Sequence, residues 1–180
     1  MGKDYTEKTL SSKTVYDGKI IKVNVDTVQL PNGKEAKREV VHHQGAVGIL
    51  TINKNNNIIL VKQYRKPLEK MILEIPAGKL EKNESPVDCA LRELKEETGY
   101  TANNIEQIVK FYTSPGFADE LIYLFKANDI HKGKTELDED EFVETIELTL
   151  SEVIDLIKKD EINDAKTLIA IYHWQLESKR

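Results

Sequence analysis

The segment from Gly78 to Tyr100, GKLEKNESPVDCALRELKEETGY, combines strong helix signals with a crowd of acidic side chains. Ser85 is a suitable N-cap residue and Pro86 suits the first helical position, whereas Gly99 is a natural C-terminal stop. A helix is therefore expected between Ser85 and Gly99. It has to accommodate three glutamates within little more than one turn, which we call the glutamate cluster: Glu93, Glu96 and Glu97.

A rotation of about 100° per residue divides this helix into two faces. The apolar face, which we expect to pack inward, consists of Val87, Leu91, Leu94 and Thr98. The glutamate cluster lies on the other side, within an arc of about 100°, and its side chains are expected to be exposed. Like charges three or four residues apart on a helix repel by roughly 0.2–0.5 kcal/mol per pair, so the cluster needs an explanation.

Two interpretations of the glutamate cluster remain open from the residues alone. It is either a solvated helix face, in which Lys95 softens the repulsion, or a site for a divalent cation. Several carboxylates and a backbone carbonyl from the bend at residues 76–78 are hard oxygen ligands, which suit Mg²⁺ or Mn²⁺. A zinc site is not expected, because His42 and His43 are adjacent on a strand and point to opposite faces.

The rest of the chain reads as strands with a few helices. Residues 13–43 predict a small antiparallel sheet, because residues 19–30 alternate apolar and polar side chains and Asn32-Gly33 is a hairpin turn signal. A second hairpin is expected from residues 46–53 and 57–65. Further strands are expected within residues 71–78, 105–114, 120–128 and 142–150, and helices from Ser151 and from Asp164 to Leu176. This mixture favours an α/β or α+β fold in layers.

Composition limits the partners of the chain. Its 180 residues carry a net charge of −5, whereas a general nucleic-acid binder normally has a basic patch or a high pI. No apolar run approaches the roughly 18 residues of a membrane span, and the single cysteine, Cys89, excludes an intramolecular disulfide. We therefore expect a cytoplasmic protein that binds neither nucleic acid nor membrane.

The segment around the glutamate cluster resembles the Nudix box of the Nudix hydrolases. Gly78 is followed after five residues by Glu84, and after seven more by the run from Arg92 to Gly99, RELKEETG. Tyr100 is the one loose match, at a position where the pattern asks for a bulky aliphatic residue. The resemblance implies the Nudix fold, an α/β/α sandwich around a mixed sheet. It also implies a domain division into a dimer-forming N-terminal sheet, 1–43, and a hydrolase domain, 44–180.

Features outside the box are similar to the ADP-ribose pyrophosphatase subgroup of this family. Pro115 lies sixteen residues after Gly99, and shorter likenesses occur at REVV (38–41), QYR (63–65), EIPAG (74–78) and DEDEFVE (138–144). The implied reaction is the metal-dependent hydrolysis of ADP-ribose to AMP and ribose 5-phosphate. Alternatives are another nucleoside diphosphate sugar, a dinucleotide or a modified nucleotide as substrate, or a non-catalytic module that senses nucleotide sugars. Such modules usually lose box residues, which are all present here.

The resemblance also implies roles for individual residues. Glu93 and Glu97 are the expected first ligands of Mg²⁺, with Mn²⁺ as an alternative, and Glu96 and the Ala77 carbonyl complete the site. Arg92 is expected to orient the glutamates through charge-assisted hydrogen bonds, and Glu84 to support the loop. Two acidic residues near the C-terminus complete the expected chemistry, Glu139 as the general base and Glu141 as a further metal contact. The alternatives are a base from the box itself and a plain solvated acidic loop.

Substrate contacts are expected from strands. Arg65 is placed to contact a phosphate or the ribose, and Arg38 and Glu39 to hold the adenine, although ordinary strand surface is the alternative for these residues. Ile21 stands where an aromatic side chain would be expected to stack on adenine, and an apolar residue covers a base with less stacking energy. Other candidates for this contact are Phe117 and Tyr112, whereas His173 and Trp174 on the last helix are expected to be structural.

The N-terminal sheet has few core partners of its own, and small isolated sheets are seldom stable alone. In the resembling subgroup this sheet is exchanged or paired between subunits, so we expect a homodimer. In the last helix, Leu168, Ile171, Tyr172 and Gln175 share a mostly apolar face.

Overall fold

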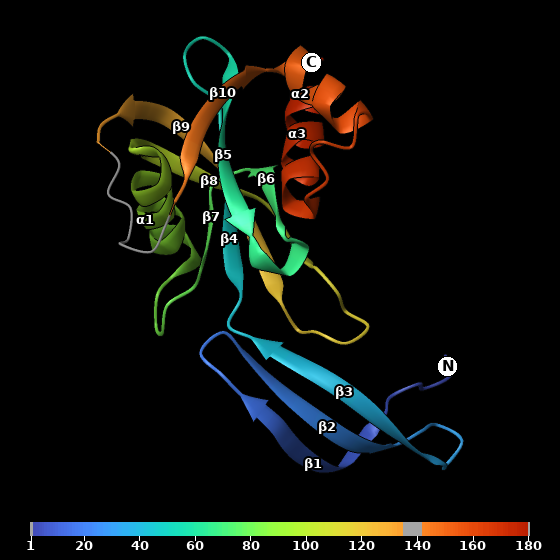
Figure 1. The fold of residues 1–180 in the computed structure, drawn as a ribbon. Helices are drawn as coiled ribbons and strands as arrows, with labels where there is room; N and C mark the ends of the chain where they lie inside the picture. The colour runs from blue at the N-terminus through green and yellow to red at the C-terminus, as the bar shows by residue number, and fades with distance from the viewer. Residues whose placement is uncertain (1, 135–141, 180) are drawn as a thin grey trace. The chain divides into compact units, whose positions relative to one another are not determined.

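The structure of the protein is a computed structural model that describes residues 2–134 and 142–179 (Figure 1). Contacts between Cα atoms divide the chain into two compact units. The first consists of residues 1–45 with 112–121, and the second of residues 46–111 with 122–180.

The first unit contains the predicted antiparallel sheet. Its strands are β1 (Lys8–Asp17), β2 (Ile21–Gln29) and β3 (Glu35–His43), in the order β1-β2-β3. The turn between β2 and β3 includes Gly33 at a φ of 82°, a left-handed conformation that favours glycine. The sheet confirms the prediction and begins earlier than expected, at Lys8. Val28 is the only buried hydrophobic residue among those described in this unit, so its core is very small.

The loop of residues 112–121 lies along the end of β3. The Val41 amide donates to the Phe117 carbonyl at 2.8 Å, and the Asp119 amide donates to the Val41 carbonyl at 3.1 Å. The Asp119 side chain contacts the two histidines, with 2.7 Å to His42 Nδ1 and 2.8 Å to the His43 amide. Burial raises the pKa of Asp119, but these hydrogen bonds outweigh burial and lower it. Asp119 therefore fastens the loop to β3.

The second unit contains two sheets. The strand orders are β10-β5-β6 and β7-β4-β9-β8. The seven strands are β4 (Ala46–Thr51), β5 (Asn57–Arg65), β6 (Lys70–Glu74), β7 (Ala77–Lys79), β8 (Tyr100–Tyr112), β9 (Leu121–Lys132) and β10 (Glu144–Thr149), and a short 3₁₀ helix, η1 (Lys66–Leu68), follows β5. The four-stranded sheet is mixed, because β4 is antiparallel to β7 and parallel to β9.

The predicted second hairpin is wrong. β4 and β5 belong to different sheets, and within the described part of the chain they share an isolated bridge between Ile52 and Ile58. β4 instead pairs with β7 and β9, which come later in the sequence. Apolar strands on both sides of a short turn favour a hairpin locally, but here the pairing with distant strands prevails.

Helices cover both faces of these strands (Figure 1). They are α1 (Pro86–Thr98), α2 (Leu150–Lys158) and α3 (Ala165–Glu177). Val47 and Ile49 of β4 share one buried hydrophobic cluster with α1, whereas Leu50 shares the other with α3. Because successive side chains of a strand point to opposite faces, the helices sandwich the sheet, as the predicted α/β/α fold requires.

The inward face of α3 coincides only in part with the apolar face expected from the sequence. Its buried residues are Lys166, Thr167, Ala170, Ile171 and Trp174. Tyr172 is 47% exposed although it lies on the mostly apolar face, whereas Trp174 is structural as expected. The buried face of α3 is rotated relative to the apolar face, because it includes the polar residues Lys166 and Thr167. Hydropathy alone assigns these two residues to the surface.

Candidate functional site

Helix α1 begins and ends where its capping residues predict. The Ser85 hydroxyl accepts a hydrogen bond from the Asp88 amide at 3.1 Å, and Pro86 is the first helical residue. Gly99 has a φ of 71° and its amide donates to the Lys95 carbonyl at 2.8 Å. Because these signals are local, the capping residues set the ends of α1 and thereby the positions of the glutamate cluster along it.

The predicted exposure of the glutamate cluster is wrong for two of its three members. Glu93 is 8% exposed and Glu97 is 4% exposed, whereas Val87, expected inside, is 42% exposed. The reason is the contact of α1 with the short strand β7. A Cβ atom on Gly78 would lie 1.8 Å from Cδ of Glu93, so the carboxylate occupies the space that the missing side chain leaves.

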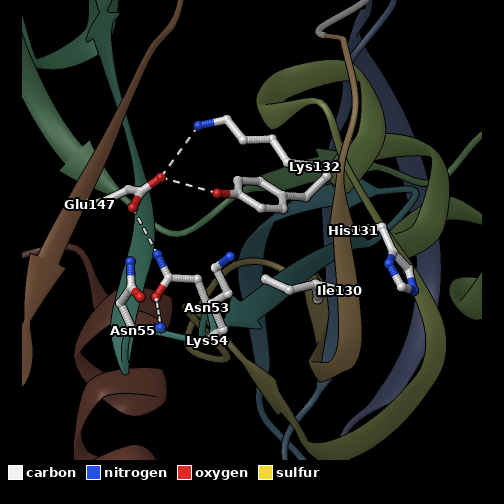
Figure 2. A pocket seen from close by; sticks show the side chains of 8 residues that line it. Asn53, Lys54, Asn55, Ile130, His131, Lys132 and Glu147 are labelled. Carbon is white, nitrogen blue, oxygen red and sulfur yellow. Dashed lines mark hydrogen bonds and ion pairs between the residues drawn. The ribbon is translucent and has the colours of Figure 1, made fainter.

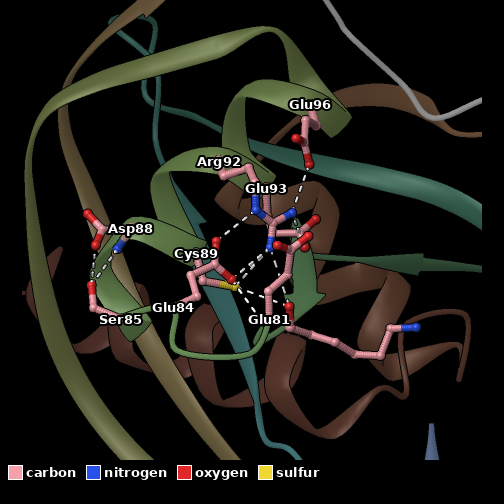
Figure 3. Close-up of polar contacts among 9 residues, drawn as sticks. Glu81, Glu84, Ser85, Asp88, Cys89, Arg92, Glu93 and Glu96 are labelled. Atoms are coloured by element: carbon pink, nitrogen blue, oxygen red, sulfur yellow. Dashed lines mark hydrogen bonds and ion pairs between the residues drawn. The ribbon is translucent and has the colours of Figure 1, made fainter. Parts of the chain in front are cut away.

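Arg92 joins the cluster to the preceding loop (Figure 3). Its Nε and Nη2 atoms donate to the two oxygens of Glu84, at 2.8 and 3.0 Å. Its Nη1 atom donates to both Glu93 and Glu96, at 2.8 and 2.9 Å. One guanidinium therefore orients three carboxylates, two of which belong to the glutamate cluster.

The charges of this group shift its pKa values. The hydrogen bonds from Arg92 hold the pKa of Glu84 at about 2, against an ordinary value of 4.5. The hydrogen bond to Glu84 and the neighbouring carboxylates raise the pKa of Arg92, so it stays charged. Burial, aided by Glu84, raises the pKa of Cys89 to about 12, which keeps this free thiol neutral and unreactive at physiological pH.

The third member of the cluster, Glu97, contacts residues 75–78, which we call the strap and which lead from β6 into β7. Its Oε2 atom accepts a hydrogen bond from the Ala77 amide at 3.0 Å. Just before Ala77, the Pro76 carbonyl accepts from the Ile49 amide of β4 at 2.8 Å, which fixes the course of the strap. Ala77 thus binds Glu97 through its backbone amide, and Gly78 leaves room for the Glu93 carboxylate because it has no side chain.

The donor set fits a hard divalent cation. No three or more His, Cys, Asp or Glu side chains of residues 2–134 and 142–179 form a metal cluster as they stand. Mg²⁺ does not require one, because it keeps several waters and uses one or two protein carboxylates with substrate phosphates. Glu93 and Glu96 reach the same Arg92 nitrogen and Glu97 follows one position later, so carboxylate oxygens are gathered on one side of α1.

A second group of charges, which we call the Glu74 network, consists of Arg65, Glu74, Asp164 and Lys166. Its central residue, Glu74, was not predicted from the sequence. Glu74 is 1% exposed and accepts from Arg65 Nε at 2.6 Å and from Arg65 Nη2 at 3.0 Å. Lys166 also donates to Glu74, and lies 3.0 Å from Asp164. The signal available in the sequence was the single acidic residue in the apolar run MILEIPAG.

Other predicted residues lie elsewhere. Arg38 and Glu39 are exposed on β3 and Ile21 begins β2, so all three belong to the first unit, as do the exposed rings of Tyr112 and Phe117. Arg38 makes a two-point ion pair with Glu7, at 2.6 and 2.9 Å. Glu139 and Glu141 lie outside the described residues. The relation of these residues to the glutamate cluster stays a prediction.

A separate hollow of about 610 Å³ lies near the start of β8 and the end of β9 (Figure 2). Glu147 lines it and accepts hydrogen bonds from Asn53 at 2.7 Å, Tyr100 at 3.0 Å and Lys132 at 3.5 Å. The Lys132 ammonium also lies 5.5 Å from the centre of the Tyr100 ring. The hollow shares no lining residue with the glutamate cluster or the Glu74 network.

Comparisons with known proteins agree with the box and the fold. The NUDIX domain family model matches residues 42–171, and the model of the nucleoside diphosphate sugar hydrolase N-terminal domain matches residues 7–41. A solved structure of an ADP compounds hydrolase has a TM-score of 0.86 at 24% identity, covering 99% of this chain and 97% of that one. At this identity the likeness shows the fold alone.

Two curated relatives are 52% identical to the chain. One is a methanol dehydrogenase activator of Bacillus methanolicus, matched over 98% of this chain and 97% of its own length. The other is an ADP-ribose pyrophosphatase of Bacillus subtilis, matched over 97% and 96%. A GDP-mannose pyrophosphatase of Yersinia enterocolitica is 35% identical over 77% of this chain and 78% of its own.

None of the helices that the structure describes is both long and apolar enough to cross a membrane. The matched family model covers more than half of the chain, and the fold, the capped helix and the glutamates at their expected spacing agree with it. The chain therefore belongs to the Nudix hydrolase family.

Proposed function

We propose that this protein hydrolyses the pyrophosphate bond of ADP-ribose and releases AMP and ribose 5-phosphate. The observation that carries the proposal is the 52% identity, over nearly the full length of both chains, to an ADP-ribose pyrophosphatase. The position of Pro115 and the EIPAG segment at residues 74–78 support the same substrate.

The glutamate cluster is the proposed metal site. Glu93, Glu96 and Glu97, with the Ala77 carbonyl, would hold Mg²⁺ or, alternatively, Mn²⁺, and enzymes of this class generally use a divalent metal. The metal would offset the charge of the diphosphate and lower the pKa of a bound water. Arg92 keeps Glu93 and Glu96 together in advance, which reduces the ordering required when the cation binds.

Glu139 is the proposed general base and Glu141 a further metal contact, and both lie outside the described residues. A base has to reach the attacking water within hydrogen-bond distance, and a pKa near the working pH serves it best. Glu96 is the alternative within the box. Of the three cluster carboxylates it is the one that is not fully buried, so it is the more accessible to water.

Cationic side chains are proposed to bind the substrate. Arg65 is 40% exposed at its side chain and is the proposed contact for the diphosphate. Arg38 and Glu39 are the proposed adenine contacts, with Ile21 covering the base. The ion pair of Arg38 with Glu7 does not prevent this, because both side chains are partly exposed and such pairs are worth only about 0–1 kcal/mol.

The first unit supports a homodimer. All ten residues of β1 are exposed, and the exposed hydrophobic side chains of this strand and its flanks include Leu10, Val15, Tyr16 and Ile20. A sheet with so little core gains stability by pairing with a second copy of the chain. We propose that residues 1–43 form that interface and that the protein acts in the cytoplasm, where its free Cys89 would stay reduced.

The proposed reaction is tested by incubating the protein with ADP-ribose and Mg²⁺ in ¹⁸O-water and reading the products by mass. We expect AMP and ribose 5-phosphate, one of which carries the label and thereby identifies the attacked phosphorus. GDP-mannose, a dinucleotide and an oxidised nucleotide serve as competing substrates, compared by kcat/KM. Absence of AMP, or a higher kcat/KM on another substrate, would refute the assignment.

A second candidate function follows from the other relative of 52% identity, which is named as an activator of methanol dehydrogenase. On this alternative the protein would raise the activity of a partner dehydrogenase. A methanol dehydrogenase assay with and without the protein tests it, and the double variant Glu93→Gln/Glu97→Gln separates an effect of hydrolysis from one of binding alone.

A further inference from the structure

Glu74 is a buried carboxylate shared by two cations. Arg65 contacts both of its oxygens from the end of β5, and Lys166 contacts Oε2 from the first turn of α3. Lys166 is only 8% exposed, whereas the Arg65 side chain is 40% exposed. A buried charge is tolerated where it is paired, so these contacts determine where each side chain lies.

The first turn of α3 holds this arrangement at two points. Asp164, the N-cap of α3, makes an ion pair with Lys166 at 3.0 Å and accepts from the Thr167 amide at 3.0 Å. The Thr167 hydroxyl donates to Asp164 at 2.6 Å and accepts from the Ile75 amide at 2.9 Å. The side chain of Glu74 and the backbone that follows it are therefore both fastened to α3.

The same strap leads to the glutamate cluster. Two residues after Ile75, the Ala77 amide donates to Glu97 at 3.0 Å. Burial lowers the pKa of Arg65, but the contact with Glu74 and the nearby charges of Glu97 and Asp164 outweigh burial and raise it. Arg65 thus lies within the electrostatic field of Glu97, at the partly exposed edge of the network.

We propose that Lys166 is a positioning residue for the substrate, because it holds Glu74 and through Glu74 orients the Arg65 guanidinium toward the diphosphate. The inference rests on the proposed function, in which Arg65 contacts that group. Lys166 fixes one oxygen of Glu74, and the two-point contact then sets the plane of the guanidinium.

The first test is Lys166→Met, in which Glu74 keeps Arg65 as a partner. KM for ADP-ribose is expected to rise about 10–100-fold, the usual loss when an outer residue behind a ligand contact is removed, with much less change in kcat. The Kd of ADP-ribose, measured by calorimetry in EDTA where no turnover occurs, is expected to rise in the same ratio. Lys166→Arg restores the charge and the donors and is expected to recover most of the affinity.

Lys126→Met is the matched control. Lys126 makes an ion pair with Glu177 at 2.7 Å, at the other end of α3, and its side chain is 25% exposed. Its loss removes an ion pair from the same helix without touching Glu74. KM is expected to stay within about twofold of wild type, as for independent sites. A rise in KM equal to that of Lys166→Met would show a general effect of loosening α3 and would overturn the proposal.

A double-mutant cycle with Arg65→Met decides whether Lys166 acts through Arg65. If it does, the double variant has the Kd of Arg65→Met alone, whereas additive losses overturn the inference. If Lys166→Met does not fold, Lys166→Gln replaces it, because its side chain is uncharged and one bond shorter and therefore holds Glu74 less firmly, and a wild-type Kd there also overturns the inference. Lack of ADP-ribose hydrolysis by the wild type would instead refute the proposed function.

Discussion

The two charged groups of the second unit differ in their balance of charge. Around Arg92, one guanidinium faces three carboxylates, those of Glu84, Glu93 and Glu96. The Glu74 network contains two cations, Arg65 and Lys166, and two carboxylates, Glu74 and Asp164. Among these residues, the first group has more carboxylates than cations, whereas the second has equal numbers of both. This difference is the reason for proposing a metal site in the first group and a positioning role in the second.

The double variant Glu93→Gln/Glu97→Gln is expected to have the largest effect. An amide has the shape of the carboxylate but lacks its charge, so metal binding should be lost while packing is kept. Because a bound metal supplies several kcal/mol of charge stabilisation, kcat/KM should fall about a thousandfold. Steady-state assays with ADP-ribose measure the loss.

The stability of the same variant is its control. Removal of two like charges relieves repulsion and should cost the metal-free protein little stability, because the amide oxygens that replace the carboxylates can still accept from Arg92 and from the Ala77 amide. Thermal unfolding in EDTA measures this. Unchanged turnover would show that these residues are not ligands, and a large loss of stability would show that the two carboxylates are already balanced by charges within the protein.

The equivalent change in the Glu74 network should cost more stability. Glu74→Gln leaves Arg65 and Lys166 with no carboxylate between them in a buried place. Breaking a buried ion pair on one side costs about 3–5 kcal/mol, so the free energy of unfolding in urea should fall by that amount. Glu69→Gln is the control, because the Lys66–Glu69 pair is exposed and is worth about 0–1 kcal/mol. Equal effects of the two substitutions would contradict the difference between the groups.

Glu84 is the member of the acidic group whose ion pair with Arg92 is expected to stabilise the fold. Its pKa is about 2 in the folded protein, against an ordinary 4.5. A carboxyl whose pKa is lowered by folding stabilises the protein above its unfolded pKa, and that stability is lost as the pH falls from 4.5 toward 2. The difference corresponds to about 3 kcal/mol.

Glu84→Gln should therefore be less stable than wild type by up to about 3 kcal/mol at pH 7. This gap in the free energy of unfolding should close as the pH falls from 4.5 toward 2. Urea unfolding from pH 7 down to pH 3 measures the gap. Glu81→Gln, in the same loop with an exposed side chain, should show no such gap. A gap that stays constant with pH would indicate that Arg92 does not lower the pKa of Glu84.

Local features were predictable from the sequence, and contacts between distant segments were not. The ends of α1 follow from Ser85, Pro86 and Gly99, which act within one turn, so the box and its spacing were identified correctly. The burial of Glu93 depends on β7, a strand of three residues whose pairing with β4 joins residues about thirty positions apart. A helical projection treats every carboxylate as a surface residue and has no information about such a strand.

The Glu74 network shows the same limit more clearly. Glu74 and Lys166 are separated by 92 positions in the chain. Each of the two is a charged residue within a mostly apolar segment. Their opposite charges can be recognised as a pair only once β6 and α3 are packed together. The predicted hairpin of β4 and β5 failed for a related reason, since the pairing of β4 with β9 spans more than seventy residues.

Gly78→Ala tests whether the space in β7 is required for the glutamate cluster. The added Cβ would lie 1.8 Å from Cδ of Glu93, so the carboxylate has to move away from the strap. A misplaced ligand group should lower kcat/KM and metal affinity about 10–100-fold, less than its removal does. Gly48→Ala is the matched control on the neighbouring strand, because its Cβ would meet the end of the Ile75 side chain at 2.9 Å and no carboxylate. Gly48→Ala should lower stability but change metal affinity little, as measured by Mn²⁺ titration. Equal losses of metal affinity in both variants would mean that the sheet, and not the space above Gly78, controls the site.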